Sequence, residues 1–485
     1  MVGAESASAD SVASSPGGEL APARMLPPRV VIAGTSSGAG KTTVACGLIA
    51  ALRVRGSTVQ GFKVGPDYVD PSYHALASGR PGRNLDAFLS GPELIAPLAR
   101  HGASGADIAV IEGVMGLFDG ASGRGELAST AHVAKLLGAP VVLVLDAAAM
   151  ARSAAAIVHG YATFDPELEL AGVIFNQVGS DHHEQLLREA VEPLGIPVLG
   201  ALRRDDRIRA PERHLGLVPA GERVQRTRTA LDTLAAALAR YTDLEAIERL
   251  AGTAPPLPGP AWSPEAPSPR TSDARVAIAR GPAFSFHYEE NLELLEAAGA
   301  ELYEFDPLRD RKLPAGAGAL VLAGGFPEVF GEELAANAPL RAEVAALAAA
   351  GRPILAECGG LLYLLDELDD RPMCGVLPGH GRMTGRLTLG YREAVALTAT
   401  PWLEPGTRVR GHEFHYSSVE APPDADPAWE LSARSVARRE GFVSGAVHAS
   451  FLHVHWAAHP ELAARFAAAA ARPAVGPTAR PAVRA

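Results

Sequence analysis

The chain has 485 residues, a length that suits two or three domains better than one. Apolar residues make up 47% and charged residues 20%, the balance of a globular protein with a large core. The formal net charge of -11 argues against a broad electrostatic surface for nucleic acid, although a few backbone amides can still bind phosphate in an acidic protein.

Cysteine usage and hydrophobic runs bear on the cellular compartment. Cys46, Cys358 and Cys374 are too few for a disulfide framework and fit a reducing compartment. The apolar runs fall well short of the ~20 residues of a membrane span, so we expect no membrane partner. Residues 1–27 lack the basic start and apolar segment of a secretory signal, and we interpret them as a disordered tail. We therefore expect a cytoplasmic protein.

Composition also predicts the domain organisation. Residues 253–273 are rich in proline and predict a stiff, extended linker, and residues 472–485 predict a second disordered tail. The folded blocks would then be residues 28–252 and 274–471, each of single-domain size. Both alternate short apolar runs with helical patterns, which predicts α/β domains with parallel sheets. The expected strands are Arg29–Gly34, Val59–Val64, Ile108–Glu112, Val141–Asp146, Gly172–Asn176, Val198–Ala201, Arg275–Arg280, Glu301–Phe305, Ala319–Ala323, Pro353–Glu357 and Gly445–His455.

The first block opens with a strand, a glycine-rich loop and a helix start, Gly34-Thr-Ser-Ser-Gly38-Ala-Gly40-Lys41-Thr42-Thr43. Free N–H groups and the helix dipole favour an anion there. Lys41 can reach the β- and γ-phosphates of ATP, and the Thr42 hydroxyl can bind Mg²⁺. Thr35 stands where the common motif has glycine, and the competing interpretation is a turn that only caps a helix. The strand–loop–helix context favours a nucleotide site formed by Gly38, Gly40, Lys41, Thr42 and Thr43.

The class of nucleotide enzyme follows from the start of this loop. A partition-type ATPase would carry a second lysine where this chain has Ser36. The loop instead resembles that of dethiobiotin synthetase and its relatives, which use ATP to phosphorylate a carboxylate or carbamate.

Acidic residues follow successive strands of the first block. Glu112 ends a strand, Asp119 follows it in a glycine-containing loop, and Asp67 follows Lys63 in an earlier turn. Carboxylates at the carboxyl ends of parallel strands lie beside the phosphate loop and suit Mg²⁺. An isolated Asp is more often a turn cap, but three acidic loops in one sheet favour a functional interpretation.

Three segments extend the resemblance: Lys63-Val-Gly-Pro-Asp-Tyr-Val-Asp-Pro, Asn84-Leu-Asp-Ala-Phe and Ile111-Glu-Gly-Val-Met-Gly-Leu-Phe-Asp-Gly. They resemble the cobyrinate or hydrogenobyrinate a,c-diamide synthase family, whereas cobyric acid synthase differs at these segments. The resemblance implies that Asp67 and Glu112 hold Mg²⁺ together with Thr42 of the phosphate loop, and that Asp67 and Asp119 contact the corrinoid carboxylates. Asn176, at a later strand end, either reads the adenine or caps the strand.

The second block carries a candidate nucleophile. Cys358, in Glu357-Cys358-Gly359-Gly360, lies at a strand-to-helix turn, where neighbouring amides can stabilise an oxyanion. The helix N-terminus is expected to lower the thiol pKa. The Gly324-Gly325 turn after an earlier strand would form the oxyanion wall. Cys46 and Cys374 are interpreted as buried structural residues.

A cysteine nucleophile needs a base, and the block resembles the class I glutamine amidotransferases. Many of them place the base in His-Pro-Glu, but here those letters, His459-Pro460-Glu461, look like a helix start with proline at its first position. The preceding strand should instead end at the base, His453, with His455 as reserve. The orienting acid is then missing, which leaves a Cys–His dyad or an acid supplied from elsewhere.

The expected activity combines both blocks. Cys358 and His453 would release ammonia from glutamine, and the first block would use Mg²⁺ and ATP to activate two corrinoid acetates as acyl phosphates. The competing interpretations are another ligase of the same plan, such as cobyric acid synthase or a nickel-tetrapyrrole diamide synthase, and a non-enzymatic nucleotide switch. The expected partners are small molecules, and monomer and homodimer both remain open.

Overall fold

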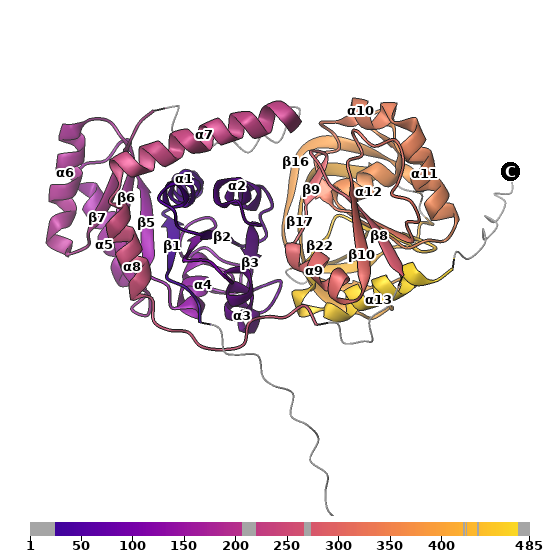
Figure 1. Ribbon diagram of the computed structural model, residues 1–485, viewed down its shortest axis with the longest axis horizontal. Helices are drawn as coiled ribbons and strands as arrows, with labels where there is room; N and C mark the ends of the chain where they lie inside the picture. Colours follow the sequence, from indigo (N-terminus) through magenta and orange to yellow (C-terminus); the bar gives the residue numbers. More distant parts are fainter. Residues whose placement is uncertain are drawn as a thin grey trace, which may run out of the picture.

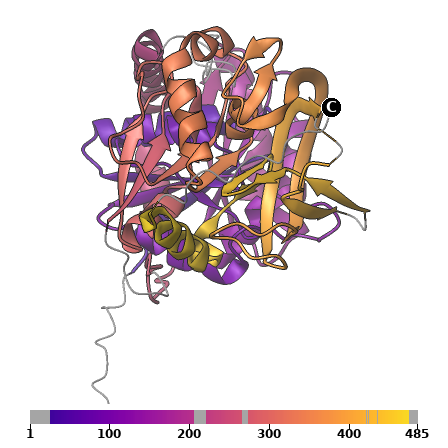
Figure 2. The same cartoon turned by 90° about the vertical axis from the view of Figure 1, so that its right-hand side faces the viewer.

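The computed structural model describes residues 25–205, 220–265, 273–420, 422, 424–433 and 436–473. They form two halves that lie side by side (Figure 1). Figure 2 looks onto the second half, with α13 in front and the first half behind it. Within the described residues, no helix is both long and apolar enough to cross a membrane.

The first half is built on a parallel sheet with the strand order β3-β2-β4-β1-β5-β6-β7. Its central strands are continuous apolar runs, because helices cover both faces of the sheet. The strands are β1 Arg29–Gly34, β2 Val59–Val64, β3 Arg83–Leu85, β4 Ile108–Glu112, β5 Val141–Asp146, β6 Leu170–Val178 and β7 Val198–Arg203.

The helices of this half divide between the two faces of the sheet. Helix α7 lies across α1 and α2, on the opposite side from α3 and α4 (Figure 1). The helices are α1 Lys41–Val54, α2 Val69–Ser78, α3 Pro92–Gly102, α4 Thr130–Leu137, α5 Ser153–Phe164, α6 Asp181–Val191, the short η1 Glu192–Leu194, α7 Ala220–Tyr241 and α8 Leu244–Thr253.

The start of the proline-rich segment is fastened to the first half. The Arg100 guanidinium on α3 donates to the carbonyls of Leu257, Pro258 and Pro260 at 3.0, 3.1 and 3.1 Å. The backbone N–H of Trp262 donates to Pro97 at 2.9 Å. Residues 257–262 therefore form a strap along α3, and residues 266–272 lie outside the described structure.

The second half contains a sheet with the order β10-β8-β11-β13-β21-β20, parallel except for its edge strand β20. The strands are β8 Ala274–Ala279, β10 Ala300–Phe305, β11 Ala319–Leu322, β13 Ile354–Glu357, β20 Phe442–Ser444 and β21 Val447–Ser450, with a small ladder of β9 Phe284–Phe286 and β12 Gly324–Gly325. The helices are α9 Glu289–Ala297, α10 Gly331–Ala336, α11 Ala338–Ala349, α12 Gly359–Leu364, the short η4 Trp456–Ala458 and α13 Pro460–Ala471.

A second, largely antiparallel sheet was not predicted. It follows the order β15-β14-β16-β17-β22, with β18 and β19 attached to β16. Its long strands are rich in polar residues and glycine, many of them exposed, and so they lack an apolar run. The strands are β14 Leu365–Leu368, β15 Arg371–Pro372, β16 Leu377–Ala396, β17 Arg408–Glu420, β18 Trp429–Ala433, β19 Val436–Glu440 and β22 His453–Val454.

The prediction of one strand over Gly445–His455 was wrong. The chain leaves the parallel sheet after Ser450 and joins the antiparallel sheet at His453. The Glu440 carboxylate lies at the bend, where it accepts hydrogen bonds from the Ser450 hydroxyl at 2.5 Å and the Phe451 N–H at 2.7 Å. His453 therefore begins a new strand and does not end the preceding one.

Candidate active sites

The phosphate loop connects β1 to α1 in the conformation that its glycines allow. Gly38 and Gly40 have φ of +82° and +101°, values that favour glycine. Gly34 leaves room for Lys41, because an added Cβ would lie 2.8 Å from the lysine Cγ. The Lys41 ammonium donates to the carbonyls of Ser36 at 2.8 Å and Met115 at 2.5 Å, which ties the loop to the segment after β4.

Glu112 is the centre of a buried polar cluster beside this loop. Its Oε1 accepts hydrogen bonds from the Thr42 hydroxyl at 2.6 Å and the Lys63 ammonium at 2.9 Å, and its Oε2 lies 2.7 Å from Nε2 of His74. Burial alone would raise the pKa of Glu112, but Lys63, His74 and Thr42 hold it well below its usual range. The side chain is therefore a carboxylate, and its oxygen beside the Thr42 hydroxyl fits the oxygen ligands that Mg²⁺ prefers.

Lys63 also pairs with a second carboxyl group. Its ammonium lies 2.7 Å from Oδ2 of Asp70. Burial and the charge of Glu112 raise the pKa of Asp70 to about 8, although Lys63 opposes this change. Cys46 lies behind the cluster, where burial and the charge of Glu112 raise the pKa of its thiol, which fits the predicted structural role.

The other predicted residues of the first half lie in the surrounding loops. Asp67 accepts N–H bonds from Val69 at 2.8 Å and Asp70 at 3.3 Å and so starts α2 as a turn cap. Asp119 is exposed and accepts the Gly116 N–H at 2.9 Å. These contacts leave the predicted metal and substrate roles of both residues open.

Asn176 lies at the phosphate loop. Its amide donates to the Ala39 carbonyl at 3.1 Å, and its side-chain oxygen accepts the Gln177 N–H at 2.9 Å. Its Nδ2 would lie 2.1 Å from a Cβ added to Gly40. Asn176 therefore supports the loop directly, and a contact with the adenine stays a prediction.

Cys358 occupies a sharp turn between β13 and α12. Its backbone, with φ 49° and ψ -100°, is strained for a residue with a side chain. The next two residues must be glycines, because a Cβ on Gly359 would lie 3.0 Å from the Gly325 nitrogen and a Cβ on Gly360 would lie 2.1 Å from the Leu322 oxygen. The turn thus packs directly against the Gly324-Gly325 segment, and the role of this segment as an oxyanion wall stays a prediction.

The expectation of a lowered thiol pKa was wrong for this structure. Burial raises the pKa of Cys358, and the nearby Glu328 carboxylate adds to the increase. The N–H of Gly359 at the start of α12 acts in the opposite direction but does not outweigh them. The thiol therefore needs a base to remove its proton.

His453 is placed against the same glycine turn. A Cβ added to Gly324 would lie 2.4 Å from its Cε1 and 3.3 Å from its Nε2. The residue is 1% exposed and pairs with His412 of β17 across the antiparallel sheet. The structure therefore brings His453 to the turn that also adjoins Cys358.

An aromatic residue of the first half covers His453. Tyr68 follows Asp67, and its ring centroid lies 5.0 Å from that of Phe286, 4.8 Å from that of Tyr288 and 4.8 Å from that of His453. The Tyr68 hydroxyl is buried beside that of Tyr288. The loop that carries the predicted substrate residue Asp67 thus reaches the predicted base.

Polar contacts surround this aromatic junction. Arg83 pairs with Glu290 at 2.7 Å, and the Tyr391 hydroxyl donates to Asp86 at 2.8 Å. The sequence did not predict these contacts, although Asp86 lies in the Asn84-Leu-Asp-Ala-Phe segment that resembles the family. That membership is the only signal in the sequence that could have pointed to Asp86.

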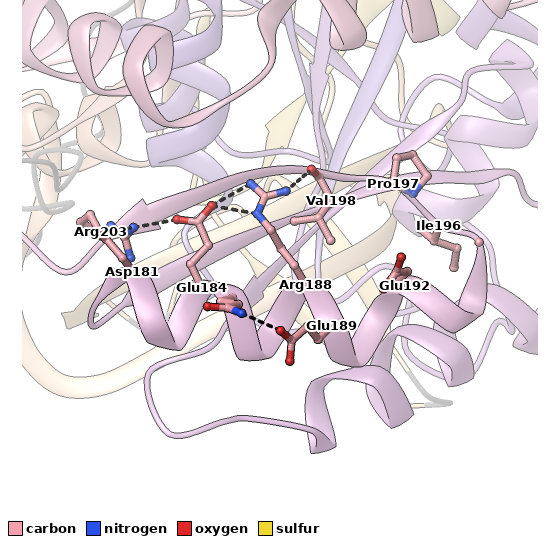
Figure 3. Close-up of a pocket in the computed structure, with 11 residues that line it drawn as sticks. Asp181, Glu184, Arg188, Glu189, Glu192, Ile196, Pro197, Val198 and Arg203 are labelled. Carbon is pink, nitrogen blue, oxygen red and sulfur yellow. Dashed lines mark hydrogen bonds and ion pairs between the residues drawn. The ribbon is translucent and has the colours of Figure 1, made fainter.

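A surface hollow lies away from these sites, between α6 and the edge strand β7 (Figure 3). Its charged groups pair with one another: Arg203 contacts Asp181 at 2.6 Å and Glu184 at 2.7 Å, and Arg188 contacts Glu184 at 2.8 Å. The strand order separates β7 from β1 and its phosphate loop by two strands. We assign no chemistry to this hollow.

Comparison with known proteins matches both halves. Residues 30–218 match the CobQ/CobB/MinD/ParA nucleotide binding domain, and residues 275–461 match the CobB/CobQ-like glutamine amidotransferase domain. The hydrogenobyrinate a,c-diamide synthase of Streptomyces coelicolor is 56% identical over 90% of this chain and 96% of its own length. The chain belongs to the hydrogenobyrinate and cobyrinate a,c-diamide synthase family.

Two further members of this family show the range of the similarity. The hydrogenobyrinate a,c-diamide synthase of Mycobacterium bovis is 53% identical, over 91% of this chain and 98% of its own length. The cobyrinate a,c-diamide synthase of a Synechococcus strain is 45% identical, over 90% and 97% respectively. The family resemblance predicted from the loop motifs is confirmed, and so is the α/β fold class with a nucleotide-binding half followed by an amidotransferase half.

Proposed function

We propose that this protein uses ATP and glutamine to convert the a and c acetate carboxylates of cobyrinic or hydrogenobyrinic acid to amides in cobalamin biosynthesis. The observation that carries this proposal is the contact of Tyr68, from the loop beside the phosphate site, with His453 at the cysteine turn. The contact joins a site suited to carboxylate activation to a site suited to ammonia release. The three cysteines of the protein are unpaired, which fits a reducing compartment, and we propose the cytoplasm.

The second half would supply ammonia. His453 takes the thiol proton of Cys358 as the sulfur attacks the side-chain carbonyl of glutamine. The N–H groups beside the Gly324-Gly325 turn stabilise the oxyanion. The carbon–nitrogen bond then breaks, the proton leaves on ammonia, and water hydrolyses the thioester to glutamate and the free thiol.

The first half would activate the carboxylate. Lys41 and the loop N–H groups hold the ATP phosphates, and Asp67 and Asp119 position the corrinoid. Thr42 and Glu112 would hold Mg²⁺, with Asp67 as a further ligand, and the ion would neutralise charge on the transferred phosphoryl group. The acetate oxygen attacks the γ-phosphate, and ammonia then displaces phosphate from the acyl phosphate to give the amide.

Activation is needed because a carboxylate is a poor electrophile at neutral pH. Ammonia must also reach the acyl phosphate before it is protonated in solution. The aromatic junction around Tyr68 lies between the two sites and would exclude water there.

The test compares wild-type protein with Cys358→Ala, given Mg-ATP and either cobyrinic or hydrogenobyrinic acid. We expect a diamide from wild-type protein with glutamine, no amide from the variant with glutamine, and recovery of the diamide when ammonium replaces glutamine. Mass spectrometry of the products identifies the number of amides and the tetrapyrrole. Four amides, or amidation of a nickel tetrapyrrole only, would favour the related ligases, and ATP binding without glutamine hydrolysis would favour a nucleotide switch.

A further inference from the structure

Three histidines of the described segment 453–461 each have a ring nitrogen 3.5 Å from a carboxylate oxygen. These pairs are His453 with Glu357, His455 with Glu290, and His459 with Glu461. Distance alone therefore does not identify the pair that serves Cys358. The surroundings of each pair do.

The His459–Glu461 pair lies at the start of α13 and is open to water. The side chains are 23% and 40% exposed, respectively. Glu461 lies in the first turn of the helix, where the helix dipole stabilises a negative charge. An exposed pair of this kind contributes little to the orientation of a histidine, because water competes for both groups.

The His455–Glu290 pair is buried but is committed to the junction between the halves. Nδ1 of His455 accepts the Ala457 N–H at 3.3 Å and so caps η4. The other oxygen of Glu290 is bound by Arg83 of the first half at 2.7 Å. Burial would raise the pKa of Glu290, but His455 and Arg83 lower it to about 2. This pair links the two halves and stabilises their contact.

The His453–Glu357 pair is joined to the nucleophile by the chain itself. Glu357 is the last residue of β13 and directly precedes Cys358. Its Oε1 accepts the Val454 N–H at 3.3 Å, and its Oε2 lies 3.5 Å from the buried Nδ1 of His453, which has no hydrogen-bond partner among the described residues. Glu357 thus contacts both residues of β22, while Nε2 of His453 lies toward the Gly324 turn.

We propose that Glu357 is the positioning carboxylate of the glutaminase site. It would orient His453 as the glutamate of the His-Pro-Glu motif orients the base in other class I glutamine amidotransferases. This inference rests on the proposed function of Cys358 and His453. In the proposed site the carboxylate stays ionised and accepts a hydrogen bond from the Nδ1–H of His453, which fixes the tautomer in which Nε2 carries no proton and can take one from Cys358. It also stabilises the imidazolium that forms when the thiol attacks.

The test is Glu357→Gln in the full chain. The glutamine oxygen can still accept the Val454 N–H, but the side chain has lost its charge and can present an N–H to Nδ1 of His453. We expect the kcat of glutamine hydrolysis to fall by ~10²–10⁴-fold, with KM for glutamine changed by less than about threefold, because uniform binding of the substrate is untouched. The acid limb of the pH–rate profile should also move to lower pH, and Glu357→Asp should recover part of the rate.

Two matched variants complete the design. Glu461→Gln removes the charge from the exposed pair and should leave the glutaminase profile unchanged. Glu290→Gln tests the buried alternative and should not move the acid limb. A wild-type rate and profile in Glu357→Gln, or a shifted acid limb in Glu290→Gln instead, would overturn the proposal.

Ammonium-dependent amidation separates this proposal from the one on which it rests. Glu357→Gln and Glu461→Gln should retain it, since no hydrogen bond or ion pair joins either residue to the described part of the first half. Loss of glutaminase activity in Glu357→Gln with retained ammonium-dependent amidation supports the positioning role. A wild-type protein without glutaminase activity would contradict the proposed function itself, and the inference about Glu357 with it.

Discussion

The ring of Tyr68 lies over the ring of His453, with 4.8 Å between their centroids. Tyr68 belongs to the loop that begins α2, beside the Glu112 cluster, whereas His453 belongs to the antiparallel sheet of the other half. The contact therefore places a residue of the ATP-using half within reach of the machinery that releases ammonia. Its consequences can be measured.

The Tyr68→Ala variant should uncouple the two reactions. Removal of the ring opens the junction between Phe286, Tyr288 and His453, so ammonia can escape to solvent. We expect the glutamate formed per amide to rise severalfold, as measured by glutamate assay and product mass. Tyr303→Ala, which removes a tyrosine of β10 paired with Arg275, is the control. An unchanged ratio in Tyr68→Ala would contradict the idea of a sealed junction.

Lys63→Met should destabilise the first half. Lys63 is buried against both Glu112 and Asp70, and its removal leaves two carboxyl groups without their cation. We expect a loss of about 3–5 kcal/mol in the free energy of unfolding, seen as a lower midpoint in thermal or denaturant unfolding. Asp70→Asn keeps the Lys63–Glu112 pair and should cost much less. Equal losses for the two variants would show that Lys63 does not stabilise through Glu112.

His448 should make the protein sensitive to acid. It is 2% exposed, and its ring centroid lies 5.4 Å from that of Trp402 and 5.0 Å from that of Trp429. Burial lowers its pKa from 6.5 to about 4. Between these values the unfolded chain binds a proton at His448 that the folded chain does not, so the contribution of His448 lowers stability as the pH drops from about 6.5 to about 4 and is constant above that window.

The matching experiment is denaturant unfolding of His448→Leu at pH 7.5 and pH 5. The variant should lose less stability than wild type on acidification, with a limiting difference of about 3 kcal/mol when the whole shift is expressed. His380→Leu, at an exposed site, should behave like wild type. The same pH dependence in His448→Leu and wild type would mean that other groups cause the acid response.

Arg100→Met should release the strap along α3. The carbonyls of residues 257, 258 and 260 would lose their shared donor. The loss would cost about 1–3 kcal/mol of local stability for each carbonyl that stays buried. We expect faster cleavage within residues 255–262 by proteinase K, located by mass spectrometry. Arg55→Met, which removes a surface ion pair on Glu248, is the control. Equal cleavage rates would show that proline content alone holds the strap.

The sequence predicted what local patterns encode. The strand–loop–helix of Lys41 and the strand–turn–helix of Cys358 each lie within about a dozen residues, and their glycines are required by positive φ or by close approach. Most strands of the parallel sheets were placed to within a residue or two for the same reason, since buried parallel strands are continuous apolar runs. The roles of the individual site residues stay predictions.

The remaining features depend on distant contacts. Strands β16 and β17 are rich in polar residues and glycine and have no apolar run, so they gave no signal. Tyr391 and Asp86 meet although they are 305 positions apart, and no periodicity links them. The bend after Ser450 contacts Glu440, a residue of another strand. The thiol pKa of Cys358 was predicted from its helix alone, whereas the burial that raises it comes from the tertiary packing.

The bend between Ser450 and His453 has a mechanical consequence. The backbone of the nucleophile is bound to the parallel sheet, where the Cys358 N–H donates to the Ser450 carbonyl at 2.7 Å. His453 instead pairs with β17 of the antiparallel sheet. That second sheet also touches the first half, through Tyr391 on Asp86 and Arg410 on the Phe88 carbonyl. The Cys358 thiol also reaches this sheet, because it lies 3.8 Å from the Phe414 carbonyl of β17. One strand, β17, therefore contacts the nucleophile, the base and the first half, so the three share a support that lies outside the parallel sheet.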